Sequence, residues 1–167
     1  PQWPGQADKM SRLMADQVMA LLRTSDARVF GDYTFYGSPS WLGVLNELQM
    51  PGQLSEATFH DHAGEERKLR NDDFLRFEAM GLAKAIFEYF EIDGFTTGAI
   101  GGIIVDEETL QPLNGVTVHM FNGLISYLTD DFGNGCYAFN DLPPGDYEVT
   151  AFKAGYDTLR FIAEVQA

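Results

Sequence analysis

The 167-residue chain has room for one ordinary domain or two small ones, and its 45% hydrophobic and 13% aromatic residues suffice for packed cores. Its 25 acidic and 11 basic residues give a formal net charge of −14, which repels polyphosphates and argues against nucleic acid as a partner. The longest apolar runs fall far short of the roughly 18 to 20 residues that a membrane-spanning helix needs, so we expect no membrane span.

The first part of the chain carries a helical pattern. Apolar residues recur at three- and four-residue steps from about Asp8 to Arg23, which predicts an amphipathic helix with one buried face. Residues 31–40, rich in glycine and aromatics, are expected to form a loop, and residues 50–56 a short strand that ends at Glu56. The apolar residues of the predicted helical face are Met10, Leu13, Met14, Val18, Leu21 and Leu22.

A second helix is predicted after the charged residues 65–68, which we expect to be a solvated run. Asn71 is a suitable cap, and Asp72 and Asp73 would lie near the positive end of the helix dipole. An apolar stripe follows, and the helix should end near Phe90. The stripe consists of Phe74, Phe77, Leu82, Ala85, Ile86 and Tyr89.

From Gly98 onward the hydrophobic period changes to two. Short β-rich runs alternate with turn clusters, a spacing typical of a β-sandwich or barrel. The predicted strands are residues 99–105, 116–121, 137–140, 147–151 and 159–165.

The turn residues between these strands have a specific order. Their pattern resembles the carboxypeptidase regulatory-like family, with its Gly-x-Val strand, Thr-Asp-x-x-Gly hairpin, Leu-Pro-Pro-Gly turn and closing Gly-Tyr. The matching segments are residues 101–106, 112–118, 129–133, 141–147 and 154–156. The resemblance implies an all-β, transthyretin-like or immunoglobulin-like sandwich over residues 98–167, an accessory module without chemistry of its own.

Polar groups inside this region are accordingly interpreted as structural. His119 is expected on one face of a strand, and Cys136 as a buried apolar residue. Acidic clusters at Asp130-Asp131 and at Asp106-Glu107-Glu108 carry the oxygen ligands that calcium prefers, but solvated turns are the favoured interpretation.

The segment before the sandwich has a resemblance of its own. Pro51, Leu54, Glu56 and Phe59 stand in the frame Pro-x-x-Leu-x-Glu-x-x-Phe, followed by a helix. This arrangement, over about residues 11–92, looks like the closing half of the zinc-dependent N-acetylmuramoyl-L-alanine amidases, in which that glutamate ends a strand and is catalytic. The resemblance implies that Glu56 is the catalytic carboxylate and that residues 1–94 are the carboxy-terminal portion of an amidase-like α/β domain.

Zinc is implied by the same resemblance, as the cofactor of the complete enzyme. The family's ligands, two histidines and a glutamate, precede the helix that begins near Ser11, and a catalytic zinc needs about three protein ligands. We therefore expect the rest of the amidase domain to lie outside this sequence, and this chain alone to be inactive, with no metal site and no bound cofactor.

Further residues near Glu56 are candidates for substrate contact. His60 and His62 would share one face if their segment were a strand, which leaves a metal site open, but contact with substrate or solvent is favoured. Tyr33 and Tyr36, in the aromatic loop, are weaker candidates for a shelf on which glycan rings stack, with loop packing as the alternative.

Together these features predict an α+β protein that belongs to an extracytoplasmic peptidoglycan amidase, with peptidoglycan or another glycan as its partner. One alternative is a fragment of a zinc carboxypeptidase, since one branch of those enzymes ends in a similar sandwich. Another is a non-catalytic binding or assembly module, in which exposed sandwich edges mediate self-association or filament formation.

Overall fold

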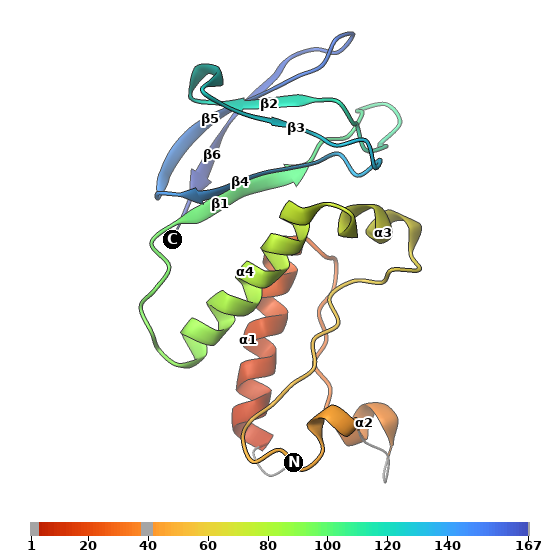
Figure 1. The fold of residues 1–167 in the computed structure, drawn as a ribbon, viewed down its shortest axis with the longest axis vertical. Helices are drawn as coiled ribbons and strands as arrows, with labels where there is room; N and C mark the ends of the chain where they lie inside the picture. The colour runs from red at the N-terminus through yellow and green to blue at the C-terminus, as the bar shows by residue number, and fades with distance from the viewer. Residues whose placement is uncertain (1–3, 38–41, 167) are drawn as a thin grey trace. The chain divides into compact units, whose positions relative to one another are not determined.

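The computed structural model describes residues 4–37 and 42–166. Its first part contains α1 (Pro4–Leu22), α2 (Asp32–Tyr36), the 3₁₀ helix η1 (Gly43–Leu45), α3 (Ala63–Leu69) and α4 (Asp72–Tyr89), as Figure 1 shows. The strands that follow are β1 (Gly98–Ile103), β2 (Thr117–Met120), β3 (Ile125–Leu128), β4 (Cys136–Leu142), β5 (Gly145–Phe152) and β6 (Leu159–Val165). The 3₁₀ helix η2 (Phe121–Gly123) connects β2 to β3. The α+β layout expected from the sequence is confirmed.

The described residues form two compact units. The helical unit comprises residues 4–58 and 76–94, and the strand unit comprises residues 59–75 and 95–166. The division falls inside α4, whose first turn groups with the strands while the remainder groups with α1. Residues 59–75 therefore belong structurally with the sandwich that follows them.

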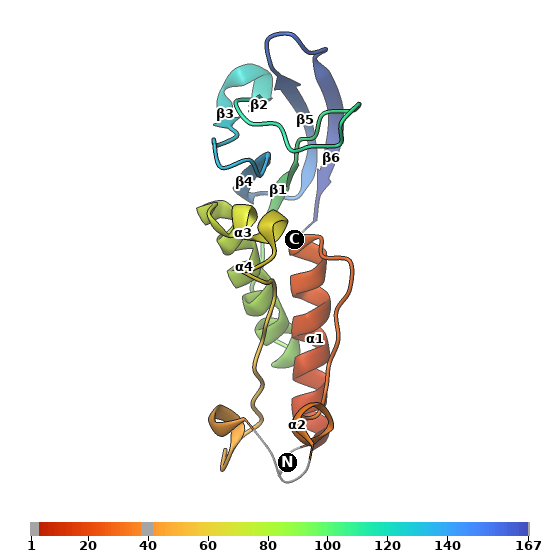
Figure 2. The same cartoon turned by 90° about the vertical axis from the view of Figure 1, so that its right-hand side faces the viewer.

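In the helical unit, α1 lies side by side with α4 in both views (Figures 1 and 2). Met14, Val18 and Leu22 form the buried stripe of α1, which confirms the predicted amphipathic helix. The helix begins earlier than predicted, at Pro4, because proline is tolerated in a first helical turn. Gly81 of α4 makes the close approach possible, since a Cβ there would stand 3.1 Å from the Cα of Val18.

Two sequence predictions for the helical unit are wrong. The loop expected at residues 31–40 contains the short helix α2, while residues 38–40 of it lie outside the described residues. The Asp32 side chain accepts a hydrogen bond from the Leu42 amide at 2.9 Å. Residues 50–56 are not a strand, but part of an extended trace that follows η1 (Figure 2). Strands exist only in pairs, and the described residues before Gly98 contain no strand with which this segment pairs.

The charged run at residues 65–68 has no buried residue, as expected of a solvated run, but it is helical. It lies within α3, where Glu65 and Glu66 occupy the first turn and Arg67 and Lys68 the last. This distribution of charge complements the helix dipole at both ends. The α4 cap is as predicted, because Asn71 Oδ1 accepts hydrogen bonds from the amides of Asp73 and Phe74 at 3.1 and 3.0 Å.

The strands of the described chain form two antiparallel sheets, one with the order β1-β4 and one with the order β3-β2-β5-β6. Their inward side chains build one hydrophobic core, in which Val118 and Val149 are fully buried. Alternating burial along β5 follows the period-two pattern of its sequence. The predicted sandwich is thus confirmed in its strands and in its two-sheet arrangement.

β3, the outer strand beside β2, was not among the strands predicted from the sequence. Three of its four residues are exposed, so it lacks the apolar alternation that identifies a half-buried strand. Its register is nevertheless regular, with Thr117 opposite Leu128 and Met120 opposite Ile125. The turn before it contains Phe121, Asn122 and Gly123, all with positive φ, which is uncommon for a bulky residue such as phenylalanine.

Candidate functional site

Glu56 is the principal candidate for chemistry in the helical unit. Its side chain is exposed, and within the described residues its carboxylate makes no hydrogen bond or ion pair. The expected position at the end of a strand is wrong, because the segment around it is irregular. Nearby, Gln53 Nε2 donates to the sulfur of Met14, which fastens the segment to α1. A catalytic role for Glu56 stays a prediction.

His60 and His62 lie in the strand unit, at a turn that leads into α3. They do not share the face of a strand, so this turn lacks the geometry in which both side chains would coordinate one metal ion. His62 caps α3, because its Nδ1 accepts a hydrogen bond from the Glu65 amide at 3.4 Å. A shallow surface depression lined by Phe59, Asp61, His62 and Glu65 lies at the same turn, whereas His60 is exposed.

Tyr33 and Tyr36 belong to the short helix α2. Their side chains lie outside what the structure describes, so their proposed contact with glycan stays a prediction.

The described residues do not form a zinc site. Among them, no group of three or more histidine, cysteine, aspartate or glutamate side chains is arranged to hold a metal ion. Since a catalytic zinc needs about three protein ligands, the donor set does not fit the metal that the amidase resemblance implies.

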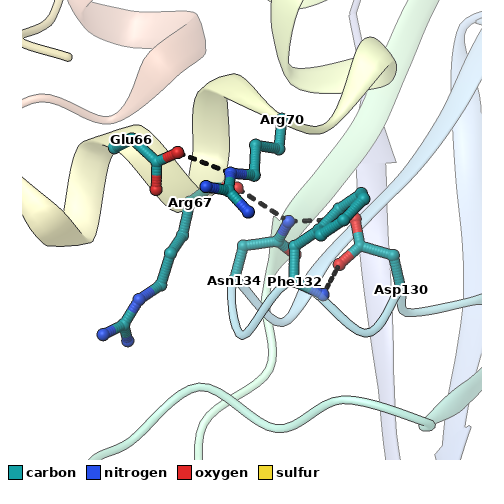
Figure 3. A network of polar contacts seen from close by, with 6 residues as sticks. All are labelled: Glu66, Arg67, Arg70, Asp130, Phe132 and Asn134. Atoms are coloured by element: carbon teal, nitrogen blue, oxygen red, sulfur yellow. Dashed lines mark hydrogen bonds and ion pairs between the residues drawn. The ribbon is translucent and has the colours of Figure 1, made fainter.

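A polar network that sequence reasoning missed lies in the strand unit, between the α3–α4 turn and the loop after β3 (Figure 3). Asp130 Oδ2 accepts hydrogen bonds from Asn71 Nδ2 at 2.8 Å and from Asn134 Nδ2 at 2.9 Å. Asp130 Oδ1 accepts a third from the Phe132 amide at 3.0 Å. Asn134 Nδ2 also donates to the carbonyl of Arg67 in α3 at 3.0 Å. The sequence signal was the Thr-Asp-x-x-Gly segment, which indicated a turn but not its contacts. The hairpin expected there is wrong, because the segment connects β3 to β4, which lie in different sheets.

The residues that form the two sheets and their turns were compared with known protein families. The model of the carboxypeptidase regulatory-like domain matches residues 99–167. Those residues form a carboxypeptidase regulatory-like domain. The family expected from the turn pattern is thereby confirmed for this part of the chain, and the network of Asp130 lies on a loop of that domain. No evidence of this kind extends to the amidase resemblance of the preceding residues.

A search of the curated proteins found no match to this chain. The helices that the structure describes are each too short or too polar to cross a membrane.

The surroundings of Asp130 and Tyr127 shift their pKa values in opposite directions. Partial burial opposes the charged form of Asp130, but the hydrogen bonds from Asn134, Asn71 and the Phe132 amide outweigh it and lower the pKa of this carboxyl below its ordinary value. Burial raises the pKa of Tyr127 to about 12, helped by its hydrogen bond to Asp73. At neutral pH the network therefore combines an ionised acceptor with a neutral phenol donor.

Two other residues of the regulatory-like domain have structural environments. Cys136 is buried, and burial, with the nearby charge of Asp130, raises its pKa to about 11. The thiol is therefore protonated and unreactive at neutral pH, as the interpretation of a buried apolar residue requires. His119 lies on β2, where its Nδ1 is 3.1 Å from the hydroxyl of Ser126 across the strand pair.

Proposed function

We propose that this chain is part of an extracytoplasmic amidase that hydrolyses the bond between the lactyl group of muramic acid and the first L-alanine of the peptidoglycan stem peptide. The observation that carries the proposal is Glu56, an exposed carboxylate in the frame formed by Pro51, Leu54 and Phe59. An accessible carboxylate without a competing partner is available to accept a proton from an attacking water. The extracytoplasmic location follows from that of the substrate.

The order of the elements supports this proposal, because the amidase resemblance implies a helix after the glutamate. Residues 51–59 lead through a turn into α3 and then into α4, whose start is fixed by the Asn71 cap. The regulatory-like domain then has the role of an accessory module. Zinc belongs to the complete enzyme in this proposal, held by residues outside those described, and Glu56 is the residue of this chain that we assign to proton transfer.

The test is the substitution Glu56→Gln in the complete protein, which keeps the shape of the side chain but removes its charge. We expect turnover of purified peptidoglycan to fall by a factor on the order of 100 to 10,000. Glu47→Gln is the matched control, since Glu47 is an exposed glutamate of the same unit. Full activity of the Glu56→Gln protein would overturn the assignment.

The zinc carboxypeptidase alternative differs in its product. An amidase releases intact stem peptide from the glycan, whereas a carboxypeptidase releases single carboxy-terminal residues. Mass spectrometry of the digest of the complete protein therefore separates the two.

A second candidate, a binding or assembly module, is favoured by the exposed apolar residues of β3. Leu124 just before the strand and Leu128 at its end are 86% and 64% exposed, on an outer strand without charged residues. Natural sheets usually protect such edges with charge, proline or bulges. If the edge mediates self-association, sedimentation velocity should show dimers or longer assemblies that Leu128→Lys disperses. A monomer at all concentrations would contradict this candidate.

A further inference from the structure

The strand unit contains a continuous series of hydrogen bonds that begins only three residues after Glu56. The Phe59 amide donates to Glu65 Oε2 at 2.8 Å, which ties the entering chain to the first turn of α3. At the other end of α3, the carbonyl of Arg67 accepts from Asn134 of the regulatory-like domain. Residue 59 is thus connected to the β-sandwich through one short helix.

Asn71 adds a second connection at the turn between α3 and α4. Its Oδ1 caps α4, while its Nδ2 donates to Asp130. Asn71 and Asn134 are only 5% and 2% exposed. Buried amides of this kind are costly unless their hydrogen bonds are made, and among the described residues no buried side-chain nitrogen or oxygen lacks a partner. The contact between the α3–α4 turn and the loop after β3 therefore depends on the orientation of these two amides as well as on their position.

Contacts at the rim support the same arrangement. The Tyr127 hydroxyl donates to Asp73 Oδ2 at 2.9 Å, which connects β3 with the first turn of α4. The Arg70 guanidinium lies over the ring of Phe132, 5.7 Å from its centroid, and pairs with Glu66 one helical turn away. Figure 3 shows Glu66 and Arg70, from α3 and the residue that follows it, beside Phe132 of the loop after β3.

We propose that the Asp130–Asn134 turn of the regulatory-like domain is a positioning site, which holds residues 59–75 and thereby fixes the point at which the chain leaves the Glu56 motif. Asp130 and Asn134 are positioning residues in this proposal and do not touch the substrate. The accessory domain then acts on the reaction through the chain that follows the catalytic motif. This inference rests on the proposed amidase function for its consequence, but the holding itself is measurable without activity.

Asp130→Asn tests the holding with a minimal change of shape. Asp130 accepts donors at both carboxylate oxygens, whereas asparagine has one acceptor oxygen and its amide group would face a donor. Asp131→Asn is the matched control, because it removes the same charge from the neighbouring exposed residue. Tyr127→Phe is a milder second variant, which removes the hydroxyl and leaves the ring that packs against Phe139.

The first measurement is hydrogen exchange of the whole chain, read by mass spectrometry. We expect Asp130→Asn to accelerate exchange of amides in residues 63–75 by about tenfold or more, the size that loss of a charge-assisted hydrogen bond gives, and Tyr127→Phe to act in the same direction. Amides of β5 and β2 should keep their protection, which shows that the sandwich remains folded. Equal exchange of residues 63–75 in Asp130→Asn and Asp131→Asn would overturn the proposal.

The second measurement is kinetic and uses the complete protein. If positioning serves the reaction, Asp130→Asn should lower kcat several-fold with little change in KM, and the pH profile should keep its shape because the proton-transfer group is intact. An unchanged kcat together with accelerated exchange would overturn the role in catalysis. A wild-type protein without amidase activity would instead refute the proposed function, and the exchange result would still decide whether the turn holds residues 59–75.

Discussion

The two units of this chain differ in how they bury their apolar residues. The strand unit encloses a shared core in which Val118 and Val149 are wholly inaccessible and aromatic residues of both sheets pack together. The helical unit buries a narrow stripe between α1 and α4, while Val44, Met50 and Phe90 remain more than half exposed. Both units also expose apolar residues, Leu124 and Leu128 of the strand unit among them. The difference lies in the core, since the two sheets enclose one between them, whereas the helical unit buries only the residues where its two long helices meet.

The largest effect is expected from a cavity in the sandwich core. Phe139→Ala removes a ring that packs edge-on against Tyr127 and Tyr137, and should lower the free energy of unfolding by about 3–5 kcal/mol. Phe152→Ala, on an exposed residue of the neighbouring sheet, should cost far less. Chemical denaturation followed by circular dichroism measures both, and equal losses would break the contrast between core and surface.

A smaller loss is expected from the contact between α1 and α4. Gly81→Leu places a side chain against the backbone of Val18, so the helices must separate at a cost of about 1–3 kcal/mol. Ala79→Leu, on an exposed position of the same helix, is the control and should be nearly neutral. The Gly81 variant should loosen the helical unit and leave exchange protection in β2 and β5 unchanged. Loss of protection in both units would show that they unfold as one.

Alkaline pH should weaken the strand unit through Cys136. Its pKa is raised by burial to about 11 in the folded chain, so the stability that depends on the neutral thiol is complete below its unfolded pKa of roughly 8.5 to 9 and is lost as pH rises through 11. Tyr127, with a pKa of about 12, continues the loss at higher pH. Melting temperatures measured between pH 7 and 11 should fall more gently in Cys136→Ala. Parallel curves would contradict this explanation.

The smallest effect should come from an exposed apolar residue of the helical unit. Met50→Gln should change the free energy of unfolding by less than about 0.5 kcal/mol, because Met50 makes no part of the buried stripe. A loss as large as that of Gly81→Leu would mean that Met50 is a core residue in solution. Thermal denaturation of the two variants side by side decides the point.

Much of the sandwich could be predicted from sequence because its signals are local. Gly155 adopts positive φ in the turn between the paired strands β5 and β6, and inward residues such as Tyr147 and Val149 alternate with outward ones along β5. The cap at Asn71 was equally visible, since an asparagine before two acidic residues begins a helix by short-range chemistry. In each case the residues that determine the structure are close together in the chain.

Features that depend on distant partners could not be predicted. A strand was expected at residues 50–56 from the frame around Glu56, but a strand requires a neighbour that sequence alone does not place beside it. β3 lacks an apolar pattern and is held by its pairing with β2. The hydrogen bonds of Asp130 to Asn71 and Asn134 join residues up to 59 positions apart. The turn motif therefore predicted a loop but not the hydrogen bonds that this loop makes.

Native-state hydrogen exchange of the whole chain, followed through increasing denaturant, tests the central division most directly. The division groups residues 59–75 with the sandwich and separates them from α1. We expect amides of α3 and of the first turn of α4 to lose protection together with those of β2 and β5, at a higher denaturant concentration than amides of α1. Residues 63–75 exchanging with α1, while the strands stay protected, would contradict the account.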